Sequence, residues 1–439
     1  MAKCSRSPSY ETGPSRGAKA KRAGVAAKPT PSPLAILSSW PVKRARGARR
    51  RRRWADLTYA LAGVITEHAL ANDVSDYMSF QAVCREWRRG AVDAAPRARG
   101  CLDRRFHPRR WIMLREAAPP GPGRHRRRFL NVSTGECVQK DLPELDGHHL
   151  LGATTEGLLT LLDKSTYVVR MLNPITRQLA ELPSLDTILS LEMRETISRY
   201  GFTSQYSVAG IGLADDSTST VALCLRKQLL VAKPGDDQWT ALRVGWRNFY
   251  SAMSFSGRFY CLAGSSVMVL EVTAANNEPP QLEVVAEITF GVSEICMDTV
   301  HLLESDGKLL LLRSWIGKSK GSIDDYYWMR KCQVYGVDLD GHRIVPVRGL
   351  RGRAVFVGWR RVVSVFTGVF PSIRSNSIYL GYDMSERTSH GIVAYNLHDR
   401  KITERCDRRG DGRAWTRPCG IGEYLSWYVS EPNGNMEEI

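Results

Sequence analysis

Side chains that could do acid–base or metal chemistry are few in this sequence, and their spacing suits neither task. His148 and His149 are adjacent, and adjacent positions of a strand point to opposite faces, so the two rings do not converge on one metal. The Asp-Asp pairs at residues 215–216 and 236–237 stand in turn-forming sequence, where aspartate hydrogen-bonds its own backbone. Glycoside hydrolysis needs two carboxylates spaced across a pocket, which adjacent residues do not supply.

Motifs of known enzyme classes and of metal sites are also missing. The sequence contains no G-x-x-x-x-G-K-[ST], no H-E-x-x-H and no G-x-S-x-G. No two of its ten cysteines have C-x-x-C spacing, and most lie in apolar runs, as buried free cysteines do. We therefore predict a non-catalytic protein of a reducing compartment, with no catalytic residue, no metal and no cofactor.

The formal charge of +17 belongs to one end of the chain. Residues 1–53 contain 15 basic side chains and one acid, and the rest contains 47 basic and 44 acidic side chains, so the two parts carry +14 and +3. Residues 1–53 have almost no large apolar groups to offset the entropy of ordering, so we predict a disordered basic tail. A charge confined to a tail says little about the ligand of the folded part, and nucleic acid is not the partner we expect.

The tail ends in a run of cations typical of a nuclear-import signal. Two other interpretations stay open: an inert solvated tail, and an organelle transit peptide, which is also rich in arginine and serine. No stretch reaches the roughly 18 uncharged apolar residues of a membrane span, so we expect no membrane contact. The expected location is the nucleus, the cytoplasm or both, or an organelle if the tail is a transit peptide. The import-like residues are Lys43, Arg44, Arg46, Arg49, Arg50, Arg51, Arg52 and Arg53.

The elements that would position a site begin with two amphipathic helices at residues 54–94, joined by a polar turn. Asp73 or Ser75 can cap the second helix by accepting hydrogen bonds from its first backbone N–H groups. About forty residues make only a small core, so the apolar stripes either meet a partner or pack on the rest of the chain. The stripes are Leu57, Leu61, Val64, Ile65 and His68, and then Tyr77, Phe80, Cys84 and Trp87.

From residue 126 to the end, short apolar runs bounded by Gly, Asp, Asn or Pro predict about twenty strands. A faint repeat of glycine-led strands favours a β-propeller of five or six four-stranded blades over a closed barrel or a sandwich. Residues 185–199 are the one long helical candidate, which we interpret as an insertion. We predict a linker at residues 95–125 and a β-propeller-like domain at residues 126–439, each part with its own core.

The two folded parts together resemble a plant family. The sequence WADL at residues 54–57, Ile65, and FQAVCREWR at residues 80–88 are similar to the F-box pattern. The later motifs resemble the KIB-type propeller, also called domain of unknown function 295, that follows the F-box in many plant proteins. They are LNPIT at 172–176, KPGDDQWT at 233–240, GRFY at 257–260, VYGVD at 334–338, RAVFVG at 353–358 and FPSIRSNSIY at 370–379.

The resemblance implies the substrate-recognition subunit of a Skp–cullin–F-box ubiquitin ligase. In such a subunit the F-box helices dock a Skp-type adaptor, which brings the cullin, and the propeller binds an unknown protein substrate. The expected adaptor-binding residues are Leu57, Leu61, Ile65, Phe80, Val83 and Trp87.

Two departures from the F-box pattern leave an alternative open. Thr58 stands where the family usually has proline, which presets the first helical turn, although Thr58 can cap the helix instead. Gly63 lies inside the same helix and costs about 1 kcal/mol relative to alanine. The alternative is a stand-alone β-propeller interaction module with a degenerate F-box. A propeller enzyme with acids or histidines converging at its centre and a nucleic-acid binder acting through the tail are further hypotheses.

Overall fold

The structure is a computed structural model of the whole chain, whose contacts divide it after Arg52. It describes residues 58–90, 103–115, 125–200, 208–215, 219–245, 248–272, 279–288, 290, 298–320, 326–382, 384, 392–405 and 420–430. The predicted basic tail, its import-like cations and Leu57 lie outside the described residues. Within the described ranges, no helix has the length and apolar character that crossing a membrane requires.

Three helices form the first described element: α1 (Tyr59–Asn72), α2 (Val74–Val83) and α3 (Arg85–Gly90). The Asp73 carboxylate accepts a hydrogen bond from the Ser75 backbone N–H at 2.7 Å, which confirms the predicted cap of α2. Thr58 is extended and precedes α1, but its side chain makes no capping hydrogen bond, so that expectation was wrong. Only its carbonyl takes part, accepting from the Ala62 N–H at 3.0 Å.

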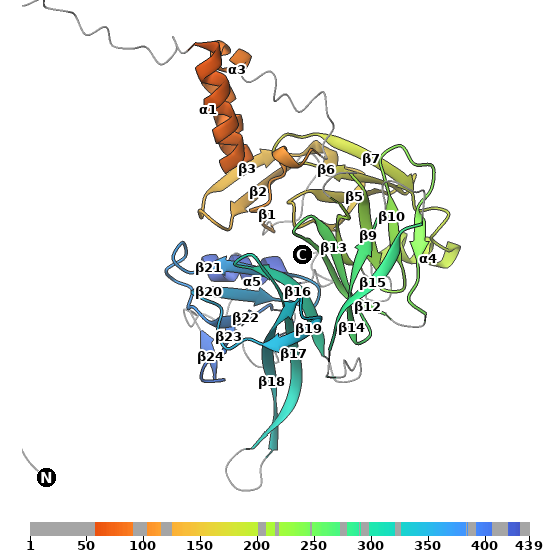
Figure 1. Cartoon of the computed structure of the whole chain (residues 1–439), viewed down its shortest axis with the longest axis vertical. Helices are drawn as coiled ribbons and strands as arrows, with labels where there is room; N and C mark the ends of the chain where they lie inside the picture. Colours follow the sequence, from red (N-terminus) through yellow and green to blue (C-terminus); the bar gives the residue numbers. More distant parts are fainter. Residues whose placement is uncertain are drawn as a thin grey trace, which may run out of the picture. The chain divides into compact units, whose positions relative to one another are not determined.

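Four groups of four strands have the build of regular propeller blades, each an antiparallel meander (Figure 1). The third and fourth blades are joined into one eight-stranded sheet by a parallel pair between β15 and β19. The innermost strands β4, β8, β12 and β16 of the four blades lie side by side in that order. The blades are β4–β7 (His148–Ala153, Leu159–Asp163, Val168–Leu172, Leu179–Ser184), β8–β11 (Val208–Leu213, Val221–Leu225, Leu229–Ala232, Thr240–Leu242), β12–β15 (Phe249–Phe255, Arg258–Ala263, Ser266–Glu271, Gln281–Glu287) and β16–β19 (Thr299–Ser305, Lys308–Lys320, Tyr326–Asp338, Arg343–Pro346).

Two further sheets depart from this build, so the structure has four regular blades and not the five or six that we predicted. One has three strands: β1 (Trp111–Met113), β2 (Arg126–Asn131) and β3 (Cys137–Asp141). The other has five strands in the order β21-β20-β22-β23-β24, with β20 and β22 parallel. Its strands are β20 (Arg353–Val357), β21 (Val362–Phe366), β22 (Ser377–Leu380), β23 (Ile392–Asn396) and β24 (Ile402–Arg405).

The remaining helices correct the predicted boundaries. The 3-10 helix η4 (Arg104–Phe106) and β1 fall within the predicted linker, so residues 103–115 belong to the folded domain. Helix α4 (Leu191–Tyr200) confirms the helical insertion, although it begins later than predicted. Helix α5 (Ile421–Val429) was not predicted, because its Tyr, Trp and Val residues are typical of strands. The 3-10 helix η5 (Pro143–Leu145) joins β3 to β4.

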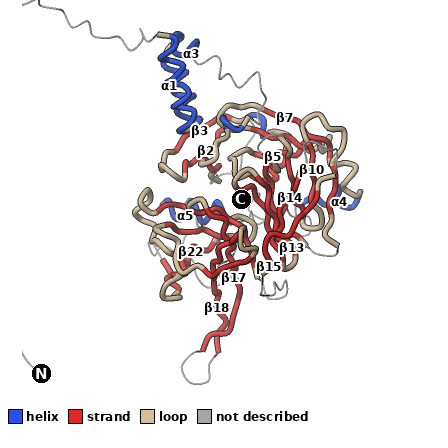
Figure 2. The backbone as a smooth tube through the Cα atoms, viewed as in Figure 1, coloured by secondary structure: helices blue, strands red, loops and turns tan. Residues whose placement is uncertain are grey.

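Six hydrophobic clusters show how the sheets pack, since each cluster is shared by two neighbouring blades or sheets. Every sheet therefore buries both of its faces, which is the reason for a propeller arrangement of short strands. Figure 2 shows how far strands outweigh helices in this domain. Representative members in ring order are Phe129 with Leu161, Met171 with Leu223, Cys224 with Phe259, Leu262 with Leu311, Leu312 with Val355, and Phe356 with Leu130.

The inner strands are joined by small side chains. A Cβ atom at Gly210 of β8 would lie 1.8 Å from the Ala252 carbonyl oxygen of β12, so only glycine allows this approach. The Ser254 hydroxyl of β12 donates to the Leu213 carbonyl oxygen at 3.0 Å. The Leu302 N–H of β16 donates to the Ser251 hydroxyl at 2.9 Å. Backbone and hydroxyl groups thus join neighbouring inner strands at these positions.

Candidate functional site

The helical segment exposes an apolar stripe. Leu61 and Val64 of α1 and Val83 of α2 are 54%, 52% and 59% exposed, and Ile65 is 37% exposed. The described residues include ten exposed large hydrophobic side chains, and these are four of the ten. They are concentrated in α1 and α2, which contain only a small part of the described residues. Several large apolar side chains that lie together on the surface indicate an interaction site.

The predicted adaptor-binding residues fall into two groups. Leu61, Ile65 and Val83 are exposed, as a contact surface requires. Phe80 is only 7% exposed, because its ring stacks on Trp87 with centroids 4.4 Å apart and planes at 23°. Phe80 therefore holds α2 against α3 and does not present itself to a partner, and Trp87 is half-buried in the same pair. Val64, which lay on the predicted stripe, belongs with the exposed group.

The opposite face of helix α2 packs against η4 and the turn between β6 and β7. Val74 and Tyr77 are buried against Phe106 of η4 and Ile175, the residue of the LNPIT motif that follows β6. The Tyr77 and Phe106 rings meet edge to face, with centroids 5.4 Å apart. The expectation of separate cores was therefore wrong: the helices share a hydrophobic cluster with the propeller.

A carboxylate fixes the same junction. Asp73 accepts a hydrogen bond from the Trp111 indole Nε1–H at 2.9 Å and from the Asn131 side-chain amide at 3.1 Å. Trp111 and Asn131 are opposite each other across the β1–β2 ladder, and both are almost fully buried. The residue that caps α2 thus also bridges two strands. The cap was predictable from the sequence, but its partners 38 and 58 positions away were not.

The polar groups at this junction are neutral or locally paired. Burial raises the pKa of the Tyr77 hydroxyl, and the nearby Arg105 guanidinium opposes that effect. Tyr77 therefore stays protonated and accepts a hydrogen bond from the Gln81 amide at 2.5 Å. Arg105 pairs with Asp103 at 2.7 Å and lies over the Phe106 ring. These contacts lie where α2 packs against η4.

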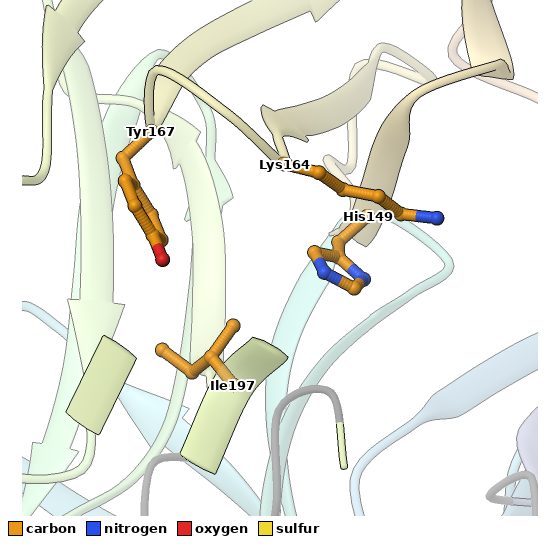
Figure 3. Close-up of a pocket in the computed structure, with 4 residues that line it drawn as sticks. All are labelled: His149, Lys164, Tyr167 and Ile197. Atoms are coloured by element: carbon orange, nitrogen blue, oxygen red, sulfur yellow. The ribbon is translucent and has the colours of Figure 1, made fainter. Parts of the chain in front are cut away.

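A small pocket in the first blade is lined by His149, Lys164, Tyr167 and Ile197, with a volume of about 130 Å³. In Figure 3, His149 and Lys164 lie on one side and Tyr167 on the other, and the lysine ammonium points away from the tyrosine hydroxyl. These polar ends do not converge on one atom, as a catalytic site would require. Across the described ranges, no group of three or more His, Cys, Asp or Glu side chains could hold a metal ion.

Two buried titratable side chains lie elsewhere in the propeller. Burial lowers the pKa of His301 on β16 to about 4, and its Nε2 has no hydrogen-bond partner among the described residues. Burial also raises the pKa of Glu156, in the turn between β4 and β5. They lie on different blades, and nothing in the described structure joins them into an acid–base pair.

Comparison with known proteins agrees with this architecture. The family model described as KIB1-4 beta-propeller matches residues 129–396, which is more than half of the chain. No curated protein matches the sequence. Because the family model spans the four regular blades and parts of both other sheets, it accounts for the ring that the structure shows.

Solved structures are similar only at a low level. The β-propeller domain of Cps50 (Swd1) from Myceliophteria thermophila is 11% identical, with 66% of this chain and 97% of that chain covered and a TM-score of 0.27. Dihydro-heme d1 dehydrogenase NirN is 14% identical, with 66% and 65% covered and a TM-score of 0.24. Similarity this low carries no argument about function. The match that decides the relationship is the one to the family model, and by it the chain belongs to the KIB1-4 beta-propeller family.

Proposed function

We propose that this chain is the substrate-recognition subunit of a Skp–cullin–F-box ubiquitin ligase. The helices α1–α3 dock the Skp-type adaptor through Leu61, Val64, Ile65 and Val83, and the propeller binds the protein to be ubiquitinated. The chain itself does no chemistry in this proposal and needs no cofactor. It acts in the nucleus or the cytoplasm, as the cationic run of the tail suggests.

The observation that carries the proposal is that α1 and α2 expose large apolar side chains while α2 is also packed against the propeller domain. One face of α2 is buried against Phe106 of η4 and Ile175 between β6 and β7. The Asp73 hydrogen bond to Trp111 of β1 holds the helix there. The stripe on the other side remains in water although its members are large and apolar. Burying such side chains at an interface contributes about 1.5–3 kcal/mol each, which makes an uncovered stripe costly and a partner favourable.

The alternative is a stand-alone propeller interaction module with a degenerate F-box. The uncapped start of α1 at Thr58 and Gly63 within that helix support it, because both weaken the helix that carries most of the stripe. The two proposals differ in one measurable property, which is the affinity of the intact chain for a Skp-type adaptor.

The test is a binding titration of the purified full chain against a Skp-type adaptor. The double variant Leu61→Ala/Ile65→Ala should bind at least about tenfold more weakly than the wild type, since a few anchor residues dominate most interfaces. Leu191→Ala is the matched control, because Leu191 of α4 is equally apolar and 75% exposed on another element.

The control should bind like the wild type, and circular dichroism should show all three proteins folded. Equal binding by the double variant would mean that the stripe is not the docking surface. No binding by any of the three would favour the degenerate F-box. The full chain is needed because α2 shares its core with the propeller, so residues 54–94 alone would lack Phe106 and Ile175.

A further inference from the structure

The pocket between the first blade and helix α4 changes from apolar to charged along its depth. Ile197 of α4 is only 1% exposed and forms its floor. His149 of β4 and Tyr167 are half-buried, and Lys164 is exposed. Figure 3 shows the His149 and Tyr167 rings on opposite sides, with Ile197 below them. The pocket thus has an apolar floor, two ring-bearing walls and a cation at its open end.

The Tyr167 ring is held in place at a cost to the backbone. The Tyr167 N–H donates to the Asp163 carbonyl oxygen at 3.0 Å in the turn between β5 and β6, and its φ is 56°. In the turn between β2 and β3 the corresponding residue is Gly135, with a φ of 76°. A positive φ is unusual for a bulky side chain, and such residues are found mostly at functional sites. The Arg194 guanidinium of α4 lies 5.9 Å from the ring centroid, so the ring is a fixed wall of the pocket.

The carboxylate that is next to the pocket in sequence faces the other side of the sheet. His148 is opposite Asp163 in the β4–β5 ladder, and His149 is opposite Leu162. Neighbouring residues of a strand alternate between the two faces, so Asp163 and His149 point to different faces. Asp163 is paired on its own face with Arg170 at 3.0 Å. The described residues that line the pocket include three side chains that can donate a hydrogen bond and none that is acidic, which favours an anion.

The size of the pocket limits the ligand to about one ring. A protein cavity of about 150 Å³ holds one benzene molecule, and this pocket has a volume of about 130 Å³. The rings of His149 and Tyr167 suit an aromatic body, because aromatic rings attract one another in stacked or edge-to-face pairs. The Lys164 ammonium suits a carboxylate, with which it forms a charge-assisted hydrogen bond.

We propose that this pocket binds an aromatic carboxylate, with its ring between His149 and Tyr167 and its oxygens beside Lys164. The inference goes beyond the proposed function, because the pocket uses none of the residues that dock the adaptor. It gives the propeller a small-molecule ligand of its own.

The test is isothermal titration calorimetry of the full chain with benzoate, which has one ring and one carboxylate. Binding should saturate with a Kd of about 1 mM or below, which a ligand of this size can reach. Benzyl alcohol keeps the ring and lacks the charge, and acetate keeps the charge and lacks the ring. Each should bind at least about tenfold more weakly than benzoate. Acetate also measures any attraction of anions to the basic tail.

Two variants test whether the ligand lies in the pocket. Lys164→Met keeps the aliphatic stem and removes the charge, so it should weaken benzoate about tenfold and leave benzyl alcohol unchanged. Ile197→Phe fills the floor and should weaken both ligands. The matched control is Lys401→Met, at an exposed lysine in a turn of another sheet, which should bind benzoate like the wild type. Circular dichroism checks folding, and Lys164→Met at an exposed side chain keeps the test decisive if Ile197→Phe does not fold.

The absence of saturable benzoate binding would overturn the proposal. Equal affinities for benzoate and either matched probe would also overturn it, because charge or ring alone would then explain binding. So would benzoate affinity that Lys164→Met leaves unchanged. Adaptor affinity of Lys164→Met should equal that of the wild type, so a failure of this proposal is distinguishable from a failure of adaptor docking.

The same two groups occur in a free aromatic acid and at the end of a protein chain that closes with phenylalanine. The peptide Gly-Gly-Phe separates these sources in the same titration. Tighter binding of the peptide than of benzoate would identify a chain end as the source of the ligand, and weaker binding would identify a free acid.

Discussion

At the scale of single residues, His301 is a titratable side chain buried in the propeller. His301 is 3% exposed on β16, in a row of the sheet with Leu312 and Val334. Burial disfavours its charged form and lowers its pKa to about 4, and a hydrogen bond with the Gly358 backbone opposes this only in part. The imidazole is thus neutral in the folded protein at a pH where it is charged in the unfolded chain.

This difference predicts a loss of stability on acidification. Well above pH 6.5 both states hold a neutral imidazole, so the titration of His301 does not change the free energy of unfolding there. As the pH falls from 6.5 towards 4, only the unfolded chain gains the proton, which costs the folded state about 2 kcal/mol at pH 5. Urea unfolding at pH 7.5 and pH 5 should show that the variant His301→Gln loses less stability than the wild type.

The matched control for this measurement is His398→Gln, at an exposed histidine of the turn after β23. Its pH dependence should follow that of the wild type. An equal loss of stability in His301→Gln and the wild type would mean that the pKa of His301 is not lowered in the folded protein.

At the scale of elements, helix α5 stands out because it joins the first and last sheets. Leu425 and Val429 are fully buried in a cluster with Leu130 of β2 and Phe356 of β20. The Tyr382 N–H donates to the Ser430 hydroxyl just after the helix, at 2.7 Å. Three of its aromatic rings each lie under a different arginine: Trp427 under Arg115, Tyr424 under Arg128 and Tyr428 under Arg361.

The ring should therefore depend on this helix. Leu425→Ala should lower the free energy of unfolding by about 2–5 kcal/mol, as the removal of a fully buried leucine side chain does. Leu191→Ala on the exposed face of α4 should change it by less than about 0.5 kcal/mol. Urea unfolding followed by tryptophan fluorescence measures both values. Equal stability of the two variants would show that α5 does not contribute to closing the ring.

At the scale of the whole molecule, all six clusters that hold the sheets together consist of residues after position 110. Deleting residues 1–53 should therefore leave the melting temperature within about 2 °C of the wild type, less than the shift that 1 kcal/mol produces in a domain of this size. The same deletion removes +14 of the charge and should shift a fluorescent fusion out of the nucleus.

Calorimetry and cell imaging test the two halves of this prediction separately. A large fall in melting temperature would mean that the tail takes part in folding. An unchanged nuclear signal would mean that the cationic run is not an import signal. A fusion lacking only residues 43–53 is the control that separates the run from the rest of the tail.

The sequence predicted those features that depend on residues close together in the chain. Short apolar runs bounded by Gly, Asp, Asn or Pro predicted the strands, and the Asp73 cap followed from a local hydrogen bond. The sequence could not tell that Phe80 is buried whereas Val83 is exposed, because both lie on apolar positions of one helix and tertiary packing decides between them. The parallel pairing of β20 with β22 was equally hidden, since local pattern does not specify which strands become neighbours.

The Asp73 junction has a consequence for modularity. A helical segment that shares a capping carboxylate with Trp111 and Asn131 cannot be moved to another protein as a self-contained unit. Cutting the chain between residues 90 and 103 would leave the Trp111 indole and the Asn131 amide without this acceptor on one side. On the other side, Asp73 would still cap α2 but would lose both of these donors. Helices and propeller should thus unfold as one cooperative unit, and a functional domain swap has to carry the chain at least through Ile175, on which α2 also packs.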